Sequence, residues 1–266
     1  MKKEVLQKEE LFHDEWANSI NLNEVMVDEF FEACTSPENR QIMSWLGNIK
    51  GKKVLELGCG LGEGSVYMAK KGARVTATDL SGGMLELAKK VAKKHGTSIE
   101  TMKCSADDLP FKSKTFDIVY AANLLHHVDI EVALKESYRV LKPGGIFVSW
   151  DPIDYNPVIK IYRRMASEVR TVDEHPLKMK DIKIFRKYFK KVKYKGKWLL
   201  TNWIFVKFYF FNKIDPSKER YWKLILKKHK KLQPLYSKLE AADEIILSIF
   251  PFFKWWCWNI VVIAQK

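Results

Sequence analysis

The chain has 266 residues, of which 47% are hydrophobic and 29% charged, and this composition excludes a globally disordered protein. Its formal net charge is +14, and the basic residues are concentrated in one part of the chain. Between Lys178 and Lys231 there are 19 lysines and arginines against three acidic residues, whereas the remainder carries a net charge of −2. This distribution favours a localised anionic partner, with a lysine-rich solvated face as the plainer alternative.

Cysteine usage and hydropathy indicate in which cellular compartment the protein is located. No CxxC pair occurs, so the sequence predicts no zinc site or other metal site, and the N-terminus has no secretory hydrophobic region. The most apolar run, WLLTNWIFVKFYFF at 198–211, has 14 residues and includes Lys207, whereas a bilayer span takes roughly 20 residues. We therefore expect a reducing, cytoplasmic location, with this run as core, pocket wall or interfacial element. The four cysteines are Cys34, Cys59, Cys104 and Cys257.

The first 50 residues are predicted to form a helical cap. Large apolar residues recur at every fourth position from Phe12 to Ile20, as on one face of a helix. Ser36 followed by Pro37 is typical of a helix start, with the serine as N-cap and the proline in the first turn. This cap would either cover the site that follows or pack against the sheet.

From residue 51 onward, expected strands and helices alternate, which indicates a parallel, doubly wound sheet. We expect an α/β fold with a Rossmann-like seven-stranded sheet, a helical N-terminal cap and a helical, basic and aromatic C-terminal insertion. The expected strands are 53–57, 74–78, 98–103, 116–121, 146–150, 190–198 and 255–264. The expected core helices are 62–71, the segment capped by Ser81, 129–141, 157–169 and 180–189. The expected domain limits are 1–50 for the cap, 51–199 for the core, 200–253 for the insertion and 254–266 for the closing strand.

A glycine-rich turn follows the first expected strand, in the sequence KVLELGCGLGEG at 53–64. Such a turn presents backbone N–H groups and a helix N-terminus to a ligand, and it serves dinucleotides, nucleotides and adenosyl cofactors alike. Asp79 lies 21 residues after Gly58, at the right distance to bind two ribose hydroxyls. An NAD-binding fingerprint requires GxGxxG, whereas this chain has GxGxG.

Five motifs between about residues 50 and 150 resemble, in order and spacing, those of the class I S-adenosylmethionine-dependent methyltransferases, especially the type 11, quinone and sterol branch. They are ELGCGLG, ATDLSGGML, SADDLPF, FDIVYAANLLHHV and RVLKPGGIFV. The resemblance implies methyl transfer from S-adenosyl-L-methionine, with S-adenosyl-L-homocysteine as the product.

The resemblance also implies a cofactor site. In it, Glu56 would order the glycine turn or meet the ammonium of the methionine part, and Asp79 would bind the ribose. Leu80 would lie against the adenine and Ser105 at its edge, where many relatives carry Asp or Asn instead. Asn123 would lie near the sulfonium. The complete set is Glu56, Gly58, Cys59, Gly60, Gly62, Asp79, Leu80, Ser105, Ala106, Asp107 and Asn123.

Methyl transfer requires alignment, exclusion of water and, where the acceptor atom carries a proton, a base. The histidine pair after the fourth strand is common in the family whatever the substrate, so a structural role is its alternative. The loop DEHP at 173–176 contains three titratable residues on the expected acceptor side, with helix capping and ion pairing as alternatives. The candidate bases are His126, His127, Glu174 and His175.

The region after residue 197 leaves the acceptor open. Its aromatic residues and lysines would dock on an anionic membrane, with a lipid or isoprenoid quinone as acceptor. Alternatively, the region binds RNA, which the clustering of the aromatic residues disfavours, or is only a lid over a small soluble acceptor. A non-catalytic scaffold that binds the cofactor is the alternative from another functional class; no oligomeric state is predicted. The aromatic residues are Trp198, Trp203, Phe205, Phe208, Tyr209, Phe210 and Phe211, with Trp255, Trp256 and Trp258 on the same face.

Overall fold

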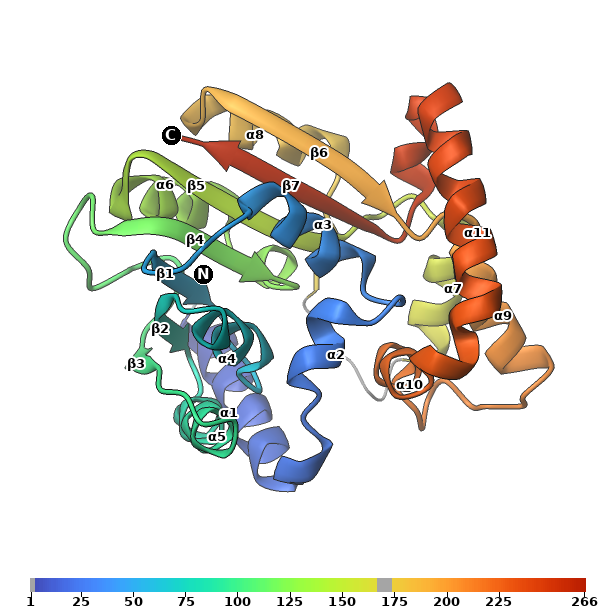
Figure 1. The fold of residues 1–266 in the computed structure, drawn as a ribbon, viewed down its shortest axis with the longest axis horizontal. Helices are drawn as coiled ribbons and strands as arrows, with labels where there is room; N and C mark the ends of the chain where they lie inside the picture. Colours follow the sequence, from blue (N-terminus) through green and yellow to red (C-terminus); the bar gives the residue numbers. More distant parts are fainter. Residues whose placement is uncertain (1–2, 167–173) are drawn as a thin grey trace.

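The apolar runs of the first half of the chain form the parallel part of a seven-stranded sheet in the computed structural model, which describes residues 3–166 and 174–266 (Figure 1). The strand order is β3-β2-β1-β4-β5-β7-β6. The strands are β1 (Lys53–Leu57), β2 (Arg74–Asp79), β3 (Glu100–Lys103), β4 (Phe116–Ala122), β5 (Leu141–Pro152), β6 (Lys191–Lys197) and β7 (Asn259–Gln265).

The last strand, β7, is antiparallel to both of its neighbours, as the opposed arrows of β6 and β7 in Figure 1 show for one of them. Its first residue, Asn259, is therefore paired with Pro152 at the end of β5 and with Lys197 at the end of β6. The carboxyl ends of the parallel strands and the beginning of β7 thus meet at one edge of the sheet. In open α/β sheets this edge is where ligands bind.

The central strands are buried on both faces, which explains their near-continuous apolar sequences. Leu55 and Val119 belong to the core on one face, and Val54 and Ile118 to the core on the other. Figure 1 shows α6 and α8 on one face of the sheet and α3 on the opposite face. The helices that connect the strands are α4 (Glu63–Lys70), α5 (Gly82–Lys94), η2 (Leu125–His127), α6 (Ile130–Val140), α7 (Pro157–Met165) and α8 (Met179–Tyr188). The expected end of α7 at residue 169 lies outside the described residues.

The N-terminal segment is helical and packs on the rest of the fold at three places: α1 against α5, α2 against α4 and α3 against β7. The expected start of α3 at Pro37 is confirmed, but the expected serine cap is wrong. Ser36 donates its hydroxyl to the carbonyl of Phe30 instead of accepting from the helix. The elements are α1 (Lys3–Ser19), η1 (Leu22–Glu24), α2 (Val27–Glu32) and α3 (Pro37–Leu46).

The insertion between β6 and β7 is helical, as expected. It consists of η4 (Leu200–Asn202), α9 (Trp203–Phe210), α10 (Tyr221–Lys227), α11 (His229–Ile249) and η5 (Pro251–Trp256). The expected strand at 255–264 begins too early, because Trp255 and Trp256 are helical and β7 starts at Asn259.

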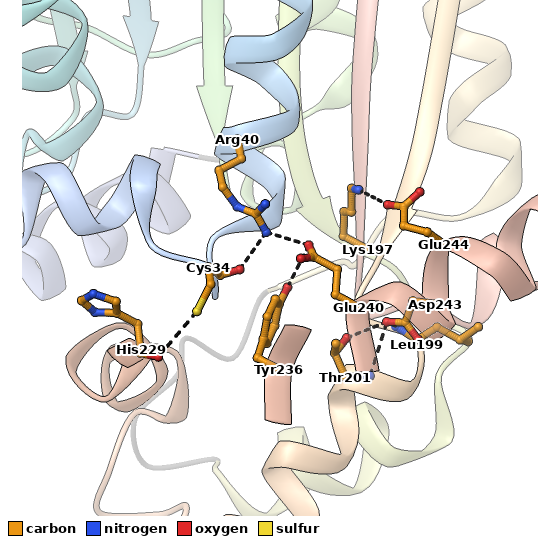
Figure 2. Close-up of polar contacts among 10 residues, drawn as sticks. All are labelled: Cys34, Arg40, Lys197, Leu199, Thr201, His229, Tyr236, Glu240, Asp243 and Glu244. Carbon is orange, nitrogen blue, oxygen red and sulfur yellow. Dashed lines mark hydrogen bonds and ion pairs between the residues drawn. The ribbon is translucent and has the colours of Figure 1, made fainter. Parts of the chain in front are cut away.

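Polar contacts fasten α11 to the core, as Figure 2 shows. The Asp243 carboxylate accepts hydrogen bonds from the backbone N–H groups of residues 199–201 and from the Thr201 hydroxyl, at 2.8 Å from the latter. Glu240 pairs with Arg40 of α3 at 2.6 Å. The insertion is therefore tied at once to the N-terminal cap and to the turn that leads into α9.

The aromatic run at 198–211 does not form one surface. Trp198, Phe205 and Phe208 are buried in a core that includes Tyr162 and Tyr221, so their expected role in membrane docking is wrong. The exposed members are Trp203, Tyr209, Phe210 and Phe211. Across 3–166 and 174–266, no helix has both the length and the apolar character that crossing a bilayer requires.

Candidate functional site

The carboxyl edge of the sheet opens into a cavity of about 320 Å³. The cavity is lined by the glycine turn after β1 and the end of β2, and also by α1, α10 and the beginning of β7. Nine of the eleven predicted cofactor residues line it, and Gly62 and Asp107 do not. Among the candidate bases, His126, His127 and Glu174 line the cavity and His175 does not.

The glycine turn requires glycine for its backbone and for close contacts. Gly58 has φ +63°, and a Cβ there would lie 2.7 Å from Cδ1 of Leu124. Gly62 has φ +86°, and its Cβ would lie 2.7 Å from the Cβ of Ala88 on α5. Non-glycine residues rarely adopt such positive φ angles. Gly62 thus allows the start of α4 to approach α5 closely, and it does not line the cavity.

Asp79 is held at the end of β2 by the two elements around it. Its Oδ2 accepts from the N–H of Gly60 at 2.9 Å, and its Oδ1 accepts from the N–H of Ser81 at 3.0 Å. Burial raises the pKa of Asp79 above its ordinary value, against the effect of these N–H groups. These two hydrogen bonds fix the Asp79 carboxylate between the glycine turn and the start of α5. The predicted N-cap role of Ser81 in α5 is confirmed, since its hydroxyl accepts from the N–H of Met84 at 3.0 Å.

Two carboxyl groups flank the glycine turn: Glu56, which is buried near the end of β1, and Glu63, which is partly buried at the start of α4. Burial raises the pKa of Glu56 to about 8, although Ser65 donates a hydrogen bond to it. Burial also raises the pKa of Glu63 to about 7. An ammonium group between the two carboxyl groups would lower both pKa values, because a nearby opposite charge favours the ionised form. Glu63 was not among the predicted site residues, although its position between Gly62 and Gly64 in the glycine turn was a signal for it.

The raised pKa of Glu56 predicts a pH-dependent stability. Since the folded protein holds a proton that the unfolded chain releases near pH 4.5, stability should fall as the pH rises from about 4.5 to about 8. Glu56→Gln removes this titration, so we expect the variant to be more stable than the wild type at pH 8 by up to several kcal/mol. Urea unfolding at pH 5 and pH 8 measures the difference; an equal pH dependence in both proteins would contradict the assignment.

The N-terminal helix lies over the site. Asp14 of α1 accepts hydrogen bonds from the Ser81 hydroxyl and, at 2.9 Å, from the N–H of Gly83 at the start of α5. Trp16 lines the cavity, and the Arg220 guanidinium stacks over its ring at 4.2 Å. The cap and the insertion therefore meet across the cavity, which no local sequence signal indicated.

The two adjacent histidines have different partners. Nδ1 of His126 lies 2.9 Å from Oδ1 of Asp151, and both side chains are buried. Burial raises the pKa of Asp151 well above its ordinary value. His127 is less buried, with its Nδ1 3.7 Å from Oε1 of Glu9 on α1. Burial acts to raise the pKa of Glu9, but the adjacent rings of His127 and His13 hold it at about 2.

The other two candidate bases lie in the segment after residue 173. Glu174 pairs with Arg163 of α7 at 2.8 Å. His175 is exposed, and its backbone N–H donates to the carbonyl of His126 at 2.8 Å. Asp173 lies outside the described residues. The ligand atoms of His126, His127 and Glu174 lie within 4.8 Å of one another, a spacing that could hold a cation, although the sequence predicts no metal site.

Besides polar residues, large aromatic and aliphatic side chains line the cavity, and eight of them make up the apolar chamber. They come from α2, β5, α7, α10 and the segments that flank the insertion, so sequence reasoning had no local pattern with which to find them. Trp198 and Trp258, expected on a membrane-facing surface, line this chamber instead. The apolar chamber consists of Phe30, Trp150, Tyr162, Trp198, Trp222, Ile225, Leu226 and Trp258.

Residues 55–149 match the family model described as a methyltransferase domain. The chain is 34% identical over 131 residues to the ubiquinone biosynthesis O-methyltransferase of Pseudomonas syringae pv. tomato, covering 47% of this chain and 56% of that one. It is also 34% identical over 168 residues to the demethylmenaquinone methyltransferase of Staphylococcus aureus, covering 60% of this chain and 64% of that one. The chain thus spans less than two thirds of the length of these curated relatives.

Solved structures share the fold at lower identity. The YcgJ protein of Bacillus subtilis has a TM-score of 0.55 at 18% identity, over 85% of this chain and 97% of that one. A geranyl diphosphate methyltransferase in complex with GPP and sinefungin has a TM-score of 0.57 at 15% identity, over 86% of this chain and 77% of that one. At these identities the likeness extends to the fold alone.

Proposed function

The chain belongs to the class I S-adenosylmethionine-dependent methyltransferases, and from this premise we propose that it methylates a small, largely apolar acceptor bound in the apolar chamber. The observation that carries the proposal is the single cavity that connects the glycine turn and Asp79 with Trp198 and Trp258. A pocket with mostly apolar walls and a few polar groups is typical of small-molecule sites. The names of the relatives, which concern ubiquinone biosynthesis and demethylmenaquinone, support a quinone-like ring as the acceptor.

The sulfonium cofactor supplies a methyl group that is already activated, so this chain has to bind, align and exclude water. The glycine turn, Glu56 and Asp79 would hold the donor. Asn123 adopts φ +54° at the end of β4, with its N–H bonded to the carbonyl of Trp150 at 2.7 Å. This unusual backbone would form part of the passage between the donor and the acceptor. The cap helix α1 and the insertion would shield the reaction from water.

We propose His127 as the base, for an acceptor whose reacting atom carries a proton. Glu9 beside it stays ionised at neutral pH, since its pKa is about 2, and can stabilise the imidazolium. His126 is instead bound to Asp151, whose raised pKa makes it a poor partner for a positive charge, so His126 would position the loop. Glu174 is engaged by Arg163.

His127→Gln is expected to lower the rate of methyl transfer by about 10²-fold, the lower end of general-base catalysis, and to leave cofactor affinity unchanged. His126→Gln is the matched comparison, and its effect should appear as lower stability. The rates are measured by transfer of labelled methyl to the active extract fraction, and the affinities by calorimetry. An unchanged rate in His127→Gln would remove this residue from the mechanism.

The proposed activity is tested with methyl-labelled S-adenosylmethionine and fractionated cell extract. We expect label in the lipid-soluble or small-molecule pool. Label in nucleic acid would favour RNA methylation by the basic region, and cofactor binding without any transfer would favour the non-catalytic scaffold. Either result would overturn the proposed acceptor class.

We also propose that the protein docks on an anionic membrane through the η5 patch, which consists of Ile245, Ile249, Phe250, Phe252 and Trp256. These side chains are 48–62% exposed. The exposed lysines of β6, the strand packed beside η5, supply positive charge near the patch; they are Lys191, Lys193 and Lys195. Aromatic residues favour the headgroup level, and lysines near an anionic surface add attraction.

Phe252→Ser/Trp256→Ser is expected to reduce co-sedimentation with vesicles containing phosphatidylserine at least several-fold at low salt. The matched control is Phe210→Ser/Phe211→Ser, which removes the exposed rings of the other aromatic patch. Vesicle binding that is absent in the wild type, or that only the control variant loses, would disprove docking through the η5 patch.

A further inference from the structure

Helix α10 of the insertion brings two cations, Arg220 and Lys223, to one ring of the N-terminal helix α1. The guanidinium carbon of Arg220 lies 4.2 Å from the centre of the Trp16 ring, and Nζ of Lys223 lies 5.2 Å from that of the same residue. Arg220 and Trp16 both line the cavity. The insertion therefore contributes a cationic side chain to the cavity wall at the place where it meets the cap.

Other contacts hold the backbone from which Arg220 extends. The next residue, Tyr221, is buried, and its hydroxyl donates to the carbonyl of Ile214 at 2.6 Å. The Thr35 hydroxyl of the cap donates to the carbonyl of Ile225 in α10 at 3.3 Å. Contact with the indole also positions the planar guanidinium, whose N–H groups match the two oxygens of a carboxylate.

The cations of α10 also lie within electrostatic reach of the glycine turn. Glu56 and Glu63, the carboxyl groups that flank this turn, line the same cavity. Burial raises the pKa of Glu63, and the charge of Lys223 acts against this rise. Burial and the charge of Arg220 lower the pKa of Lys223, whereas Glu63 acts to raise it. Acidic and basic groups from distant parts of the chain thus face one another at the cavity.

A wall with carboxyl groups on one element and a guanidinium on another is complementary to an α-amino acid, whose ammonium and carboxylate are attached to the same carbon atom. The cofactor of this family ends in such a group. We propose that Arg220 binds the carboxylate of the methionine part of S-adenosylmethionine, while Glu56 and Glu63 receive its ammonium. This inference rests on the cofactor binding in the proposed function and is independent of the acceptor. The insertion would then complete the cofactor site, from a position outside the matched residues 55–149.

The test compares the binding of S-adenosylmethionine and decarboxylated S-adenosylmethionine to the full chain by calorimetry. The second compound keeps the sulfonium and the ammonium but lacks the carboxylate. We expect the wild type to bind S-adenosylmethionine about 10- to 10²-fold more tightly, as for hydrogen bonds to a charged group. In Arg220→Gln the affinity for S-adenosylmethionine should fall about 10-fold or more, whereas that for the decarboxylated compound should not fall. Arg186→Gln, which replaces an exposed arginine of α8 outside the cavity, should retain the wild-type preference.

Equal affinities of the wild type for the two compounds would overturn the inference. A preference that survives in Arg220→Gln would do so too, because another group would then hold the carboxylate. An equal loss of both affinities would mean that Arg220 only holds α10 on α1, which would also overturn it. The wild-type comparison needs no variant; where Arg220→Gln does not fold, Arg220→Lys is the second variant, with an expected intermediate preference. Failure of the proposed function would appear differently, as a chain that binds neither compound or that shows the preference but transfers no labelled methyl.

Discussion

Asp79→Ala is expected to lower the affinity for S-adenosylmethionine by about 10²-fold. A hydrogen bond to a charged group contributes about 1.5–3 kcal/mol, two ribose hydroxyls would donate to this carboxylate, and each 1.4 kcal/mol changes affinity about tenfold. The carboxylate also accepts from the N–H groups of Gly60 and Ser81, so its loss would loosen the turn that faces the methionine part. Isothermal titration calorimetry measures the change.

Two variants separate the ribose contact from general effects of removing a carboxylate. Asp117→Ala removes a carboxylate at the opposite edge of the sheet, where it binds Lys142 and the N–H of Lys53, and should leave affinity unchanged. Asp79→Asn keeps the shape of the side chain but replaces one acceptor by a donor, so its affinity should lie between those of the wild type and Asp79→Ala. Unchanged affinity in Asp79→Ala would remove the ribose assignment.

The residues that we propose for cofactor binding lie in short motifs at strand ends, so the sequence alone could place most of them at one edge of the sheet. The turn after β1 and Asp79 at the end of β2 become neighbours as soon as the two strands pair in parallel, so local sequence determines their geometry. The residues of the apolar chamber lie in no such motif. Glu38 and Asn259, which also line the cavity, are hydrogen-bonded across 221 residues of chain, and only the antiparallel direction of β7 brings them together.

The aromatic run at 198–211 could not be assigned from composition alone, because one helix distributes the same residue types over two environments. In α9, Phe205 and Phe208 are three residues apart and face the core, whereas Trp203 and Phe210 face solvent. The helical period, rather than the count of aromatic residues, separates the two sets. The local signal also failed at Ser36, whose hydroxyl donates to the carbonyl of Phe30 instead of accepting from an N–H group of α3.

Gly64→Ala is expected to destabilise the fold by about 3 kcal/mol, the upper range for overpacking a core. A Cβ on Gly64 would lie 2.1 Å from Oε1 of Glu56 and 2.8 Å from Cε1 of Tyr120. Neither neighbour can move freely, because Ser65 hydrogen-bonds Glu56 and the Tyr120 hydroxyl donates to Asn39 at 2.7 Å. Urea unfolding with a fitted m-value measures the loss.

Gly82→Ala is the matched control, since a Cβ at Gly82 has no atom within 4 Å and the residue lies in the first turn of α5. Its stability should be unchanged or up to about 1 kcal/mol higher, because alanine restricts the unfolded chain. A similar loss in both variants would mean that glycine matters in these helices for reasons other than contact with Glu56. A loss confined to Gly64→Ala, together with weaker cofactor binding, would show that the close approach of α4 to β1 sets the position of Glu56 in the site.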